Sequence, residues 1–157
     1  MSSDDFKRDD YRALAEFRYQ IRAFLYFSEK EARTAGLNPQ HHQLLLALKG
    51  LPEGVQPTVS EIANRLHIRH HSAVELTNRL TEHGLIQKHQ DHTDRRRVLL
   101  EITVRGNALL RKLSLTHRAQ LQTVGPELIR TLRKLLKDNE ELHEQGRSRK
   151  NDLKRAR

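Results

Sequence analysis

The segment TVSEIANRLHIRHHSAVELTNRLTEHGLI, residues 58–86, decides the fold of this chain. It opens with Thr58 and Glu61 at the spacing of a capping box, in which a hydroxyl and a later carboxylate bind free backbone N–H groups at a helix start. A short helix, a brief connection at 67–69 and a longer helix ending at Gly84 are predicted to follow. This order of elements is typical of a helix-turn-helix.

The longer helix has one apolar and one mostly polar face. At about 100° per residue, Ala73, Leu76 and Leu80 point to the same side, which we predict to be the inner one. The opposite face carries His71, Glu75 and Asn78, flanked by Ser72, Val74 and Arg79. This outer face is therefore the one available to a partner.

A β-hairpin is predicted directly after the helix-turn-helix. Residues 85–89 and 97–103 have the composition of strands, and apolar residues alternate along the second of them. The segment between them, DHTDRR at 91–96, is a polar turn that ends in two arginines. A hairpin in this position is the wing of a winged helix.

Long amphipathic helices are predicted on both sides of this centre. The first covers residues 9–33, and a shorter helix begins at Pro39. From about Thr103 a long helix runs to Gly125-Pro126, which is expected to break it before a last helix. The apolar stripes of these helices exceed what the small centre can cover, so a second copy of the chain is the expected partner.

The net charge of +9 does not by itself establish nucleic-acid binding. Residues 146–157 hold six basic residues and one acidic residue, so this short tail carries more than half of the net charge. Such a tail is typical of a disordered, solvated end. All seven Phe and Tyr residues lie within the first 27 positions, which argues against the dispersed aromatic platform of a single-strand binder.

Composition also indicates the compartment. The 157 residues include no cysteine, which excludes disulfides and thiolate metal sites. The apolar runs are too short to span a bilayer, and the acidic N-terminus lacks an apolar signal core. We therefore expect a cytoplasmic protein without a membrane partner.

Four segments together resemble the MarR family of bacterial transcriptional regulators, over roughly residues 10–140. They are LNPQHHQLLLAL at 37–48, TVSEIANRL at 58–66, ELTNRLTEHGLI at 75–86 and DHTDRRRVLLEITVRG at 91–106. The most specific piece is the acid-rich wing turn ending at Arg96, which is followed at the family's spacing by Leu100, Thr103 and Gly106.

The resemblance implies a mostly α winged helix-turn-helix protein with a small β-hairpin wing that forms an intertwined homodimer. Residues 1–36 would form the N-terminal dimerisation helix, 37–104 the DNA-binding domain, 105–145 the C-terminal dimerisation helices and 146–157 the basic tail, expected to be disordered. It also implies a ligand-responsive repressor or activator that binds pseudo-palindromic duplex DNA, takes a small aromatic-acid-like effector and needs no cofactor.

The candidate DNA-binding residues lie at the start of the longer helix and at the wing tip. Early residues of a recognition helix reach base edges in the major groove, and arginines of a wing can enter a narrow minor groove. We predict DNA contacts from Arg69, His70, His71, Ser72, Val74, Glu75, Asn78, Arg95 and Arg96. Asp94 is assigned to stabilising the wing by pairing with a nearby arginine. The alternative is a solvated helix face beside a charge cluster that only stabilises the turn.

Eight of the ten histidines fall between positions 41 and 92. His67 with His71, or His89 with His92, could pair on zinc, but neither pair has further ligands that converge on it, so no metal site is predicted. His42 is the candidate for hydrogen bonding a small acidic effector, near the place where pockets form in the family. The alternative is a half-buried histidine whose hydrogen bonds are satisfied within the protein.

Two functions besides specific regulation remain open. One is a winged-helix protein–protein interaction module, which would not need an arginine-tipped wing. The other is a nonspecific, nucleoid-type DNA binder, which would depend on the tail at 146–157. The sequence has no GxSxG elbow, Gly-rich phosphate loop or HExxH motif, so we do not expect an enzyme.

Overall fold

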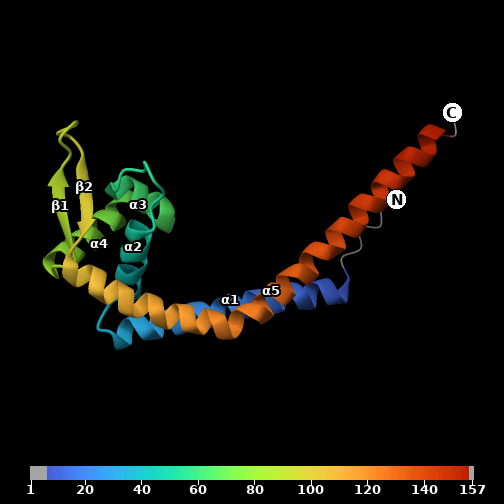
Figure 1. Cartoon of the computed structure of the whole chain (residues 1–157), viewed down its shortest axis with the longest axis horizontal. Helices are drawn as coiled ribbons and strands as arrows, with labels where there is room; N and C mark the ends of the chain where they lie inside the picture. Colours follow the sequence, from blue (N-terminus) through green and yellow to red (C-terminus); the bar gives the residue numbers. More distant parts are fainter. Residues whose placement is uncertain (1–6, 156–157) are drawn as a thin grey trace. The chain divides into compact units, whose positions relative to one another are not determined.

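The structure, a computed structural model, describes the backbone of residues 7–155 and the side chains of residues 7–136. Five helices and a two-stranded sheet follow one another in this part of the chain (Figure 1). They are α1 (Arg8–Thr34), α2 (Pro39–Lys49), α3 (Val59–Leu66), α4 (His70–Glu82), β1 (Ile86–Gln90), β2 (Val98–Ile102) and α5 (Val104–Arg155). This confirms the predicted mostly α fold with a small hairpin wing. None of the described helices is long and apolar enough to cross a membrane.

The helix-turn-helix forms as its sequence predicts. Thr58 Oγ1 accepts a hydrogen bond from the backbone N–H of Glu61 at 3.2 Å and caps α3. The reciprocal half of the capping box does not form, because the Thr58 N–H donates to Gln56 O at 2.8 Å and the Glu61 carboxylate pairs with Arg65 at 2.8 Å. His67 ends α3 in the left-handed region, with φ of 51°, and turns the chain into α4. The predicted inner residues of α4 are all buried.

The wing is an antiparallel hairpin bonded to the start of the helix-turn-helix through the middle of β2. Ile86 pairs with Ile102 at one end of the ladder, and Gln90 pairs with Val98 at the other. The backbone N–H of Leu100 also donates to Pro57 O at 2.8 Å, next to an isolated bridge between Thr58 and Leu99. Strand β2 therefore contacts both its hairpin partner and the N-cap of α3.

The beginning of α5 is bonded to the turn between α4 and β1. The backbone N–H of Thr103 donates to Leu85 O at 3.1 Å, and its hydroxyl donates to Gly84 O at 2.8 Å. The same hydroxyl accepts a hydrogen bond from the N–H of Gly106. An added Cβ at Gly106 would lie 2.1 Å from Leu85 O, so glycine permits this close approach of the two backbones.

The chain forms two compact units, whose borders differ from the predicted domain borders. One unit is Phe27–Arg118, and the other combines the chain up to Tyr26 with the chain from Ala119 onward. The predicted DNA-binding domain was 37–104. The first unit extends beyond it because Leu110 and Leu113 of α5 are buried in the same hydrophobic core as α2, α3, α4 and the hairpin.

The predicted break at Gly125-Pro126 is wrong, because α5 continues through both residues. Proline removes one backbone N–H from a helix, and its ring crowds the carbonyl of residue i−4 and the N–H and Cβ of the residue before it. Gly125 has no Cβ, so the helical backbone is tolerated there. The helix also continues through most of the tail at 146–157, as far as Arg155, whereas the sequence predicts disorder there. The side chains of that tail lie outside the described residues.

Candidate nucleic-acid interface

The first turns of α4 expose most of the predicted recognition residues. Arg69 is the N-cap residue of α4 and makes no side-chain capping hydrogen bond. His70, His71, Glu75 and Asn78 are exposed, whereas Ser72 and Val74 are half-buried. The polar face of α4 is therefore open to solvent from its first residue.

A cavity of about 660 Å³ lies where α3, α4 and the wing meet, and we call it the wing cavity. It is lined by residues of all three elements, among them Ser60, Asn64, His70, Val74, Arg96 and Arg97. The structure thus brings His70 and Val74 of the recognition helix onto one hollow with the wing residue Arg96. The other predicted DNA-binding residues do not line this cavity.

The wing cavity contains residues that sequence analysis missed. Ser60 and Asn64 are exposed polar residues four positions apart on α3, so they share one helix face. The sequence shows that spacing, but it does not show that this face of α3 is turned toward the wing. Lys88 of β1 was also missed, and its ammonium group donates a hydrogen bond to the Asn78 side chain.

The wing turn is held by two aspartates with different roles. Asp91, which is 8% exposed, accepts hydrogen bonds from the backbone N–H and the hydroxyl of Thr93, at 2.8 and 2.7 Å. These bonds lower the pKa of Asp91 below its usual value, and the bond from the backbone N–H has the larger effect. Asp94 accepts from the N–H of Arg96 at 3.0 Å and lies 3.4 Å from the Arg97 guanidinium. Asp94 thus contacts the arginine run itself.

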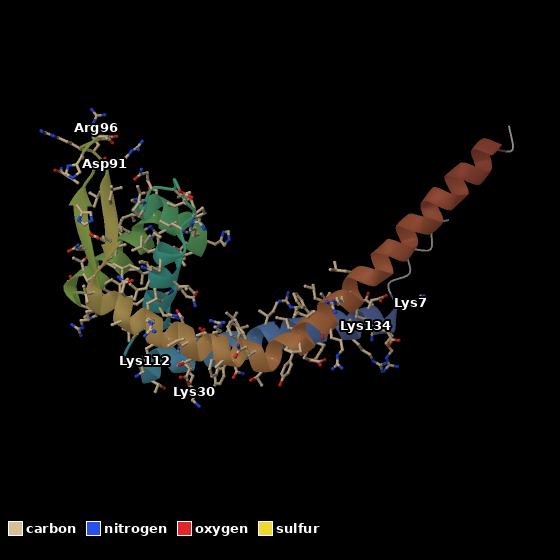
Figure 2. The ribbon with its side chains drawn as sticks, in the orientation of Figure 1. Lys7, Lys30, Asp91, Arg96, Lys112 and Lys134 are labelled. Carbon is tan, nitrogen blue, oxygen red and sulfur yellow. The ribbon has the colours of Figure 1, made fainter. Side chains whose placement is uncertain are left out.

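Both predicted wing arginines, Arg95 and Arg96, are exposed. Figure 2 shows Arg96 at the tip of the hairpin, close to Asp91, with its side chain extending away from the strands. The Arg96 guanidinium therefore stands at the outer end of a turn whose backbone is bonded to the carboxylates of Asp91 and Asp94.

We expect Asp91→Ala to loosen the wing turn. Amide hydrogen exchange over residues 91–97 should become faster, because the variant loses both hydrogen bonds from Thr93. Asp91→Asn is the matched control, since its amide oxygen can still accept them. Exchange in the alanine variant that equals wild type would contradict this role.

His42 lies in a different environment from the one predicted. Its side chain is only 2% exposed and lines neither cavity described here. Its ring centroid lies 4.8 Å from that of His117, and its buried Nδ1 has no hydrogen-bond partner. Burial, followed by the charge of His117, lowers the pKa of His42 to about 4. His42 is thus more buried than the half-buried side chain predicted, and its Nδ1 has no hydrogen bond within the described part of the protein.

A second cavity, of about 410 Å³, lies between α2 and α5, and we call it the α2–α5 cavity. Its lining includes Leu46 and Leu110 as apolar residues and Lys49 and Arg111 as cations. In the described ion pairs neither cation takes part. Among the described residues, no group of three or more His, Asp or Glu side chains could hold a metal ion.

Comparison with known proteins supports the family resemblance. Residues 35–97 match a sequence model of the MarR family. No curated protein matches the chain closely enough to count as a relative.

Solved structures match over most of the chain at low sequence identity. AbsC, a MarR family transcriptional regulator from Streptomyces coelicolor, is 21% identical with a TM-score of 0.66, covering 94% of this chain and 99% of its own. A mutant of S. aureus MepR bound to an oligodeoxyribonucleotide is 19% identical with a TM-score of 0.59, covering 84% and 95%. CouR from Rhodococcus jostii RHA1, bound to p-coumaroyl-CoA, is 23% identical with a TM-score of 0.55, covering 72% and 83%. Residues 35–97 therefore carry the sequence pattern of the MarR family, and the chain has the winged helix-turn-helix fold of MarR-family transcription regulators.

Proposed function

We propose that this protein is a sequence-specific regulator of transcription, most simply a ligand-responsive repressor, that binds a pseudo-palindromic duplex operator. The single observation that carries the proposal is the wing cavity, on which recognition-helix residues and a wing arginine converge. An α-helix fits the major groove, and a guanidinium is attracted into a narrow minor groove. One half-site would therefore receive α4 in the major groove and the wing in the adjacent minor groove.

Each candidate residue has a defined chemical role in this arrangement. The Ser72 hydroxyl can bind a phosphate or a base, Val74 can contact a thymine methyl group, and Glu75 can accept from a cytosine amino group. Arg69, His70 and His71 lie where α4 begins, and they can contact phosphates that flank those bases. Ser60 and Asn64, on the facing side of the wing cavity, add neutral donors for the same backbone.

Homodimerisation is supported by apolar residues that the second unit leaves exposed. Within that unit Gln20 of α1 donates to Thr131 Oγ1 of α5 at 3.2 Å, so the two helices contact each other. Their large hydrophobic side chains nevertheless remain accessible: Tyr11, Leu14, Tyr19, Ile21, Leu25, Tyr26, Leu121, Ile129, Leu132 and Leu136. So many apolar side chains on two helices mark a protein–protein interface, and a twofold dimer would cover them with the same surface of a second copy.

We expect the wild-type chain to have twice the mass of a single chain in size-exclusion chromatography with light scattering. Leu132, 40% exposed, should be among the covered residues. Leu132→Asp would place a carboxylate in the interface twice by symmetry, and the dimer Kd should rise about 100-fold or more. Lys134→Asp, an exposed change on the same helix, is the control and should leave the dimer intact. A dimer unaffected by Leu132→Asp would contradict this interface.

The α2–α5 cavity supports the effector part of the proposal. It combines apolar walls with the two cations Lys49 and Arg111, a lining that complements a small aromatic acid. CouR, a protein of the same fold, is bound to p-coumaroyl-CoA. Benzoate is a simple probe for this cavity: it should weaken operator binding by the wild type, and Lys49→Ala should need more benzoate for the same effect.

A fluorescence-anisotropy titration at two salt concentrations tests the proposal. The probe is duplex DNA from upstream of the protein's own gene, and the control is scrambled DNA of equal length. Tight, sequence-preferring binding by a dimer supports the regulator. Binding of both DNAs with equal, steep salt dependence would instead support a nucleoid-type binder, and truncation of residues 146–157 would then abolish it. Binding of neither DNA would favour a protein–protein interaction module.

A further inference from the structure

Helix α2 carries two adjacent histidines that are both buried. His41 is 5% exposed and His42 is 2% exposed. Each has one buried ring nitrogen without a hydrogen-bond partner, Nε2 in His41 and Nδ1 in His42. A buried polar atom without a partner costs stability, so this pair is unusual and calls for a role.

Each of these histidines faces a group that is positive or can become positive. The ring centroids of His42 and His117 of α5 are 4.8 Å apart, and those of His41 and His83, just after α4, are 6.0 Å apart. Arg79 of α4 adds a fixed positive charge that acts on His41. On α1, Ser28 and Phe27 contact His117 and are neutral, while Glu29 of that helix pairs with Arg33 at 3.1 Å. A proton on either histidine of α2 would therefore meet repulsion.

The proton position on His117 follows from its partners. Its Nδ1 lies 2.6 Å from Leu113 O, and a carbonyl oxygen only accepts, so Nδ1 carries a proton. Its Nε2 lies 2.7 Å from the hydroxyl of Ser28, which is 3% exposed. With the proton on Nδ1 alone, Nε2 accepts a hydrogen bond from the Ser28 hydroxyl. The His42 contact thus packs α2 against a ring that bonds to both α5 and α1.

We propose that the His41–His83 and His42–His117 contacts form a proton-sensitive latch, which holds α2 in the folded unit at neutral pH and releases it on acidification. The regulatory consequence rests on the proposed function. Leu44, Leu45 and Leu48 of α2 are buried in the core that supports α3 and α4. Release of α2 would remove that support, so acid would lower DNA affinity through the position of the recognition helix.

The direction of the pH effect follows from the lowered pKa values of both histidines. His42 has a pKa of about 4 when buried, against 6.5 when it is exposed by opening. Between these values the open form binds more protons than the closed form, so the latch is fully stable above pH 6.5 and weakens as the pH falls toward 4. For His42 alone, the equilibrium constant for opening of α2 should increase roughly 20-fold when the pH is lowered from 7 to 5.

The test is amide hydrogen exchange of α2 in the full chain at pH 7 and pH 5, corrected for the intrinsic effect of pH on exchange. His42→Phe keeps a ring against His117 but cannot take a proton, and His42→Asn is the second variant if phenylalanine does not fit. Opening of α2 should increase with acid in the wild type, and the increase should be about 20-fold smaller in the variants. His92→Gln, an exposed wing change, is the control and should behave as wild type.

Equal acid sensitivity in the wild type and in the His42 variants would overturn the latch. Because this exchange measurement contains no DNA, it is independent of the proposed function. Acid-dependent opening of α2 together with no DNA binding at either pH would leave the latch supported and would reject the regulator.

Discussion

Gly106→Ala is expected to destabilise the protein by about 3 kcal/mol or more, near the upper end of single substitutions. The new Cβ would lie 2.1 Å from Leu85 O and 2.8 Å from a methyl carbon of Ile102. Leu85 O cannot simply move away, because it accepts the hydrogen bond from Thr103 N–H. Relief of the clash requires separation of α5 from the turn that connects α4 to β1. Urea denaturation, monitored by circular dichroism, measures the decrease in the free energy of unfolding.

Gly125→Ala is the matched control on the same helix. Apart from its two chain neighbours and the backbone of its own helix, no described residue has an atom within 4 Å of the Cβ that would be added there. The helix propensity gained by alanine is opposed by the clash of its Cβ with the ring of Pro126, so the net change should stay below about 1 kcal/mol. Similar losses in both variants would show that Gly106 matters only as a flexible helical residue.

The double variant Arg95→Ala/Arg96→Ala is expected to lower operator affinity roughly 100-fold at physiological salt. Both side chains stand exposed on a turn that Asp91 and Asp94 hold in place. If each arginine contacts the DNA backbone or lies in the minor groove, the double variant releases about two fewer counterions from the DNA on binding than the wild type does. The slope of log K against log salt should then fall by about 2. The loss should be similar across operator sequences, because minor-groove arginines read shape more than base identity.

Lys30→Ala removes a positive charge at the other end of the same compact unit and is the control for net charge (Figure 2). It should leave both the affinity and the salt slope nearly unchanged. Anisotropy titrations at several salt concentrations give both quantities. Unchanged operator binding by the double wing variant would reject the wing as a DNA contact and leave α4 to account for recognition.

The centre of the fold could be predicted because its signals are local. The Thr58 cap, the apolar face of α4 and the polar turn between two apolar strands each lie within a few residues, and the structure forms all three. The prediction of a helix break at Pro126 is wrong for a physical reason that is also local. Proline usually ends a helix, but Gly125 has no Cβ to clash with the Pro126 ring, and α5 continues through both residues.

The sites were harder to predict because they depend on residues far apart in the chain. Ser60 and Arg96 line one cavity only after the hairpin folds back onto α3, and no periodicity reports that contact. His42 meets His117 across 75 positions, so the sequence could mark His42 as interesting but could not supply its partner. Burial without a hydrogen bond is a tertiary property, and local pattern cannot reveal it.

The bonds made by the middle of β2 and by the residue after it set a geometric condition on the DNA. Strand β2 is bonded to Pro57 before α3, and the residue that follows it, Thr103, is bonded to Gly84 and Leu85 after α4. The tip arginines and the recognition helix are therefore held at a fixed separation within one subunit. A duplex that fits must supply a major groove and a neighbouring minor groove at that separation. For stiff sequences of a different groove width, the free-energy cost of deforming the DNA lowers the affinity. We expect preferred operators to share a minor-groove width at positions that no side chain reads.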